Sequence, residues 1–178
     1  MKKMKTTLMD ALLYWFQIVV YIWPSFLIGN GLVGLIVRML VNNSNHFLSR
    51  LSETVTCVLV LCVCLFISAY RRGHKKGEFH YKSLLISLVL ATGMQLIYAT
   101  VFRFAVYTTA GAYYLAHLIY AGSDGSVTFA YDEVPAYLYI LTMCIAAVFY
   151  ITAVISGEYL GNKKRLKERA VLHLDEKI

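Results

Sequence analysis

The stretch TVTCVLVLCVCLFISAY, residues 54–70, contains no Asp, Glu, Lys or Arg side chain. A helix of about 17–25 apolar residues crosses the ~30 Å hydrocarbon layer of a bilayer. Three further uncharged runs occupy residues 11–37, 83–102 and 134–157. All four are continuously apolar rather than alternating, so helices, not barrel strands, are expected to satisfy their backbones in lipid. The sequence therefore predicts an all-α integral membrane protein, a bundle of four transmembrane helices.

The composition of the whole chain supports this prediction. Of its 178 residues, 59% are apolar and 15% are charged, whereas ordinary soluble domains have about 45–50% and about 25%. A chain this short cannot hide such an excess in one core. Four cysteines are too few for a disulfide-stapled scaffold. A water-soluble globule and a disordered chain are excluded.

The distribution of basic residues predicts the orientation. Fourteen of the seventeen Lys and Arg residues lie in three segments, 1–10, 71–82 and 158–178. The positive-inside rule places these segments in the cytoplasm, which gives an N-in/C-in protein with a basic tail at each end of a transmembrane domain over 11–157. Short basic blocks between apolar runs are typical of membrane loops and not of a nucleic-acid-binding face, so no nucleic-acid partner is expected.

A Tyr-rich segment occupies residues 104–133. Only Arg103 separates it from the third run, so the chain has no room to turn back into the membrane between the two. Because tyrosines prefer the membrane interface, we expect an external cap between the third and fourth spans, either a short helix or a β-hairpin turning at AGSDGS, 121–126. A small external binding site would use Arg103 with Asp132 or Glu133 at the mouth of the bundle.

Inside the four runs no side chain is formally charged, and the polar candidates are Gln17, Asn30 and Gln95. Such amides either contact a substrate or ion or join helices, at roughly 1 kcal/mol each; the second role is favoured. The string GNGLVG, 29–34, matches the G-x-G-x-x-G fingerprint of dinucleotide-binding proteins. We expect no dinucleotide site, because the string does not follow a strand. Close helix packing is expected there, with local unwinding beside Asn30. We expect no metal and no cofactor.

The C-terminal tail has a helical pattern that continues the fourth run. An apolar residue recurs every fourth position at Leu166, Ala170, Leu174 and Ile178, and a basic girdle surrounds it, formed by Lys163, Lys164, Lys167 and Arg169. Such a helix would adsorb to the anionic inner leaflet, dock a cytoplasmic or membrane protein partner, or simply be solvated after a stop-transfer signal.

Three functional hypotheses follow. The leading one is a non-catalytic membrane subunit or interaction protein, compatible with a homo-oligomer, because the sequence shows no charge inside the spans and no nucleophile–base pair. The second is a small-molecule transport or binding component with a polar pathway at Gln17, Asn30 and Gln95. The third is a membrane enzyme that uses loop residues His74, Glu78 and His80. The small size and lack of an organelle signal favour a prokaryotic cytoplasmic membrane.

Overall fold

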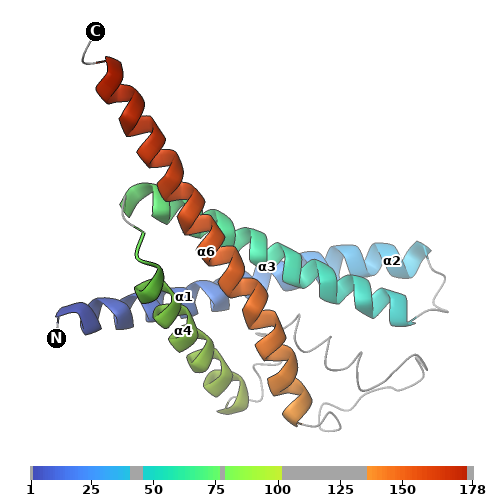
Figure 1. The fold of residues 1–178 in the computed structure, drawn as a ribbon. Coiled ribbons are helices and arrows are strands. Elements are labelled where there is room, and N and C mark those ends of the chain that lie inside the picture. The colour runs from blue at the N-terminus through green and yellow to red at the C-terminus, as the bar shows by residue number, and fades with distance from the viewer. Residues whose placement is uncertain (1, 41–45, 77–78, 102–135, 176–178) are drawn as a thin grey trace.

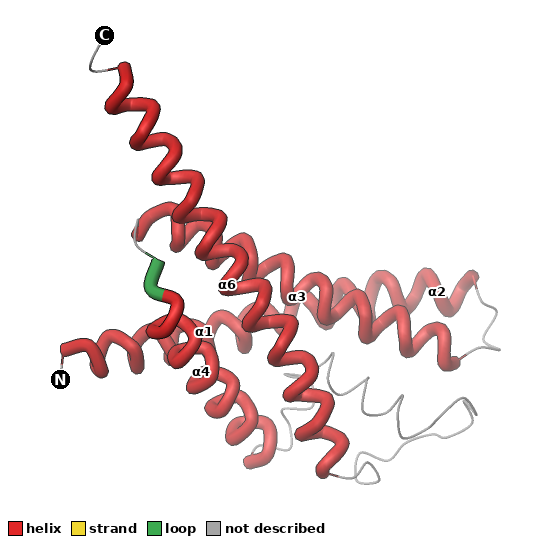
Figure 2. Tube along the Cα trace, in the orientation of Figure 1, coloured by secondary structure: helices red, strands yellow, loops and turns green. Residues whose placement is uncertain are grey.

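A computed structural model describes residues 2–40, 46–76, 79–101 and 136–175. Every element in these ranges is helical (Figures 1 and 2). In chain order they are α1 (Lys2–Phe26), the π-helix η1 (Leu27–Val33), α2 (Gly34–Leu40), α3 (His46–Lys76), α4 (Tyr81–Val101) and α6 (Ala136–Asp175). The predicted cap over 104–133, helix or hairpin, lies outside the described residues.

Within the described residues, four stretches are long and apolar enough to cross a membrane: Thr7–Val37, Leu51–Lys76, Tyr81–Tyr98 and Ile140–Ala170. Large apolar side chains such as Phe16, Val63 and Val148 point outward and are 54–63% exposed. This arrangement suits lipid as the surrounding solvent, because lipid tails are as apolar as the side chains they contact. The chain is a multi-pass membrane protein.

The first span changes its helical form halfway. Pro24 lies inside α1, and from Leu27 the chain continues as η1, in which the Gly34 N–H donates to the Gly29 carbonyl. Short π-helical segments often occur at functional sites. A Cβ at Gly29 would overlap the Cys57 sulfur of α3. The GNGLVG string therefore serves close helix packing, as the sequence analysis expected.

Contacts between side chains and backbones fix the relative directions of the helices. Gln17 pairs with Ser68 and Ser25 with Cys57, so α1 and α3 are antiparallel. Gly157 and Gly161 of α6 lie against the Phe66 and Tyr70 carbonyls of α3, so these two helices are parallel. The shared core contains buried residues from all four long helices, namely Tyr14, Ile18, Ile22, Leu61, Leu65, Ala69, Leu84, Leu88, Ala91 and Val154.

Helix α6 is much longer than a bilayer requires. Its 40 residues extend about 60 Å at ~1.5 Å per residue. In Figure 1 its red end continues past the other helices toward the C-terminus. The sequence prediction that the tail is a helix continuous with the fourth span is confirmed.

Candidate functional site at the basic end of the bundle

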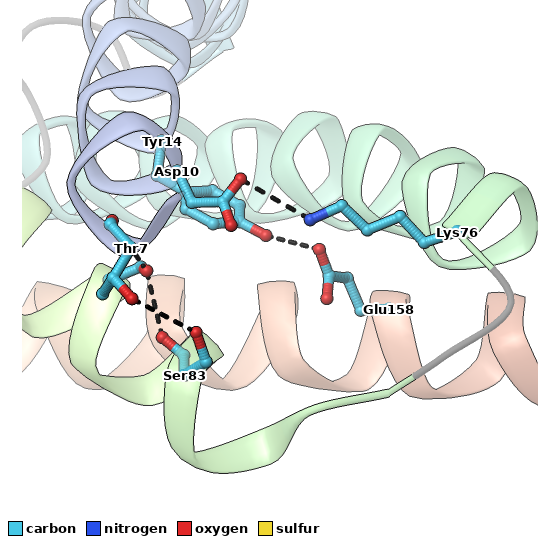
Figure 3. A network of polar contacts seen from close by, with 7 residues as sticks. Thr7, Asp10, Tyr14, Lys76, Ser83 and Glu158 are labelled. Carbon is cyan, nitrogen blue, oxygen red and sulfur yellow. Dashed lines mark hydrogen bonds and ion pairs between the residues drawn. The ribbon is translucent and has the colours of Figure 1, made fainter. Parts of the chain in front are cut away.

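A buried carboxylate, Glu158, lies where α1, α3 and α6 meet (Figure 3). The Tyr14 hydroxyl donates a hydrogen bond to Glu158 Oε1 at 2.5 Å. The Arg72 guanidinium carbon lies 4.3 Å from the centroid of the Tyr14 ring, a distance at which a cation is attracted to the ring face. Gly73 makes this approach possible, because a Cβ there would overlap the Glu158 carbonyl oxygen. We call Tyr14, Arg72 and Glu158 the polar junction.

Further polar contacts surround the polar junction and extend it to α4. Lys76 Nζ lies 3.5 Å from Asp10 Oδ1. The Ser87 hydroxyl donates to the Thr7 carbonyl at 3.1 Å, and the Thr7 and Ser83 hydroxyl oxygens are 3.5 Å apart (Figure 3). The Asp10–Lys76 pair and the polar junction thus lie at one end of the bundle, where polar contacts join all four long helices.

The prediction that no charged side chain is buried within the spans is wrong. Glu158 is 6% exposed and Glu53 is 0% exposed. The prediction ended each span at the first charged residue, whereas the helices and their packing continue beyond it. The four-residue spacing of the apolar residues on α3 could have indicated that Glu53 is buried. Every fourth residue from Glu53 onward is buried, namely Glu53, Cys57, Leu61, Leu65 and Ala69.

The same kind of signal was present around Glu158. Gly157 and Gly161 form a Gly-x-x-x-Gly pair, a spacing that lets two membrane helices approach closely. Glu158 also follows the buried Val154 by one helical turn. These two features indicate a close helix contact near Glu158, but they do not fix whether its carboxylate faces that contact or solvent.

The three predicted intramembrane amides have different environments. The Gln17 amide donates to the Ser68 hydroxyl at 2.9 Å, as expected for a side chain that joins helices. Gln95 is 5% exposed on α4. Asn30 belongs to η1, but its side chain is outside the described structure. The predicted external site, Arg103 with Asp132 or Glu133, also falls outside the described residues.

The tail cations Lys163, Lys164, Lys167 and Arg169 are exposed on the extension of α6. Two contacts hold this extension against the end of α3. His74 Nε2 lies 2.8 Å from Glu168 Oε2, and the Arg165 guanidinium donates to the Lys75 carbonyl. The tail is thus positioned by tertiary contacts as well as by helical continuity.

The hypothetical histidine site of an enzyme lies only partly within the described residues. His74 pairs with Glu168, the His80 carbonyl accepts the Leu84 N–H at 3.0 Å, and Glu78 is outside the described residues. Within the described ranges, no three His, Cys, Asp or Glu side chains gather closely enough to share a metal ion.

Three aromatic side chains lie together: Phe79 just before α4, Tyr81 at its start, and Tyr159, which follows Glu158 on α6. The Phe79 ring centroid is 5.7 Å from that of Tyr159 and 6.5 Å from that of Tyr81. Tyr81 and Tyr159 are each 50% exposed. We call Phe79, Tyr81 and Tyr159 the aromatic cluster. Half-exposed tyrosines of this kind are typical of a membrane–water interface.

No known family, curated protein or solved structure matches this chain.

Proposed function

We propose that this multi-pass membrane protein is a non-catalytic subunit or interaction protein. Its orientation is N-in/C-in, in the cytoplasmic membrane of a prokaryote, and its C-terminal helix presents a basic surface to an acidic protein partner. The observation that carries the proposal is the extension of α6: the helix is continuous to Asp175 and is held in place by contacts with α3.

The proposed orientation is supported by where the cations lie in the bundle. The Asp10–Lys76 pair joins the first turns of α1 to the end of α3, and Arg165 joins α6 to the same end of α3. The three basic segments therefore gather at one end of the bundle. Putting that end in the cytoplasm satisfies the positive-inside rule for all three.

A protein partner fits the geometry better than adsorption to the leaflet. Asp175 lies sixteen residues beyond Tyr159 on one unbroken helix, about 24 Å along the axis at ~1.5 Å per residue. An adsorbed helix lies in the plane of the interface, whereas α6 leaves the bundle without a bend (Figure 1). Leu166 and Leu172, which are 52% and 63% exposed, stand among the cations as apolar contact points.

Site-specific photo-crosslinking in cells that express the full chain tests this proposal. A photoreactive residue replaces Leu166, and the control replaces Val148, which also points outward but lies on the uncharged part of α6 before the basic residues. We expect a protein adduct of discrete mass at 166 and none at 148. Reversing the four tail cations to Glu should abolish that adduct. Phospholipid adducts at 166, or a protein adduct that survives charge reversal, would overturn the proposal.

Deleting residues 158–178 is a poorer experiment. The deletion removes Glu158 and Gly161, which belong to the packed bundle. Loss of a partner would then reflect loss of the fold.

A transport or binding component with a polar pathway at Gln17, Asn30 and Gln95 is the second proposal. The buried carboxylates Glu53 and Glu158 favour it, because ionisable groups within membrane spans often mark ion pathways. The packing between the two carboxylates is evidence against a polar pathway. Four buried apolar side chains of the α1–α3 interface lie between them, namely Ile18, Ile22, Leu61 and Leu65. Proton or substrate flux in liposomes that is lost in Glu158→Gln would support transport over the subunit hypothesis.

A further inference from the structure

His74 lies at the point where the α6 extension leaves the bundle. It belongs to the last turn of α3, and α6 approaches closely there, because a Cβ at Gly161 would lie 2.9 Å from the His74 backbone nitrogen. Seven residues further along α6, Glu168 Oε2 lies 2.8 Å from His74 Nε2. The two side chains are 39% and 48% exposed, so the contact between them exchanges protons with solvent.

The charged groups around the imidazole ring come from three helices. On α6, Lys164 Nζ lies 3.9 Å from the Glu168 carboxylate. The remaining charged neighbours, by contact or by helical spacing, are Arg71 and Lys75 of α3, Arg165 of α6, and the Lys76–Asp10 pair that joins α3 to α1. A nearby carboxylate and the negative end of a helix dipole both favour a protonated ring, whereas cations oppose it. A proton taken up by His74 thus completes an ion pair and is not left as an isolated charge.

Glu168 is the single carboxylate within the basic girdle. No other Asp or Glu occurs between Tyr159 and Leu174. An ion pair with His74 neutralises this carboxylate and holds the extension against α3. An uncharged His74 leaves Glu168 negative and weakens the hold. Protonation of one ring therefore changes both the docking of the extension and its net charge.

We propose that His74 is a pH-sensitive latch, in which uptake of a proton pairs the ring with Glu168 and docks the α6 extension on α3. Histidine is the side chain that ordinarily changes its charge between about pH 5 and 8. The extension is therefore held more firmly, and is more basic, as the pH falls through this range. The latch deepens the function proposed above, since the same extension is offered there to an acidic partner.

Hydrogen–deuterium exchange of the purified full chain in detergent, at about pH 6 and about pH 8, tests the latch. Protection factors of amides in the extension are corrected for the intrinsic effect of pH on exchange. Every protein carries His173→Gln, because His173 also lies in the extension and titrates in the same range. The test variants add His74→Gln or Glu168→Gln to this parent. The matched control adds Lys164→Gln, which removes a non-titrating neighbour of the same carboxylate.

We expect protection of the extension in the parent to be about twofold to fivefold higher at the lower pH, the range of an exposed ion pair. This difference should vanish in both test variants and remain in the Lys164→Gln control. Protection that does not change with pH in the parent would overturn the latch, and so would a change that persists in either test variant. Amides of Leu61–Ala69 in α3 should stay protected throughout, which shows that the bundle remains folded.

This exchange measurement needs no cellular partner. Its failure would therefore leave the crosslinking result at position 166 intact. A missing adduct at position 166 would likewise leave the pH dependence of the latch standing.

Discussion

The hydrogen bond between Tyr14 and Glu158 offers the sharpest test of the bundle. Tyr14→Phe removes the hydroxyl but keeps the ring on which Arg72 stacks, so it isolates the hydrogen bond. Glu158→Gln removes the charge but keeps an oxygen that accepts a hydrogen bond. A double-mutant cycle of these two changes therefore measures the coupling between the hydroxyl and the carboxylate charge.

The expected magnitude follows from the geometry. A hydrogen bond to a charged group contributes about 1.5–3 kcal/mol in soluble proteins, whereas interhelical bonds measured in a membrane protein average about 0.6 and reach about 1.7 kcal/mol. The 2.5 Å donor–acceptor distance and the 6% exposure of Glu158 place this bond near the upper membrane value. We expect a coupling of about 1–1.7 kcal/mol and a larger loss for Glu158→Leu, which leaves the buried hydroxyl without an acceptor.

Reversible unfolding by sodium dodecyl sulfate in mixed micelles measures these free energies. In a Trp23→Phe background, Trp15 fluorescence is a suitable local probe, because Trp15 follows Tyr14 in sequence and its ring contacts Tyr98 at 5.8 Å between centroids. Circular dichroism follows the helices globally. Additive effects of the two substitutions, within about 0.3 kcal/mol, would refute the conclusion that the polar junction stabilises the contact between α1 and α6.

Three further predictions concern other contacts and use the same unfolding assay. Gly161→Ala should lower the free energy of unfolding, because the added Cβ would overlap the Tyr70 carbonyl. Gly93→Ala is the control: a Cβ there would meet nothing within 4 Å, so the change should raise the free energy of unfolding by up to about 1 kcal/mol through helix propensity. Equal effects of the two substitutions would contradict the close α3–α6 contact. Gln17→Leu should cost about 0.6 kcal/mol, and no change would show that its bond to Ser68 adds nothing. Asp10→Asn should cost under about 1 kcal/mol, since the pair with Lys76 is partly exposed, and added salt should shrink this cost.

Local sequence patterns were sufficient to predict a lipid environment and the four long apolar helices of the described residues. A continuously apolar, uncharged run indicates a membrane helix, since such a helix satisfies its own backbone hydrogen bonds. The tail helix was also predictable, because the spacing of Leu166 and Ala170 continues the helical period of the fourth run. The small residues of GNGLVG also predicted that another helix packs closely against this stretch.

Only the tertiary structure decided which polar side chains are buried. The sequence shows Glu158 as the first charge after an apolar run, where either solvent or another helix would receive it. The close approach at Gly73 and Gly161 brings α3 against α6 and encloses the carboxylate beside Tyr14. That enclosure depends on residues some 85 to 145 positions away. The spacing of apolar residues within one helix shows which of its faces is apolar. Which helix lies against that face, and therefore which side chain partners a polar group, is decided only when the helices pack together.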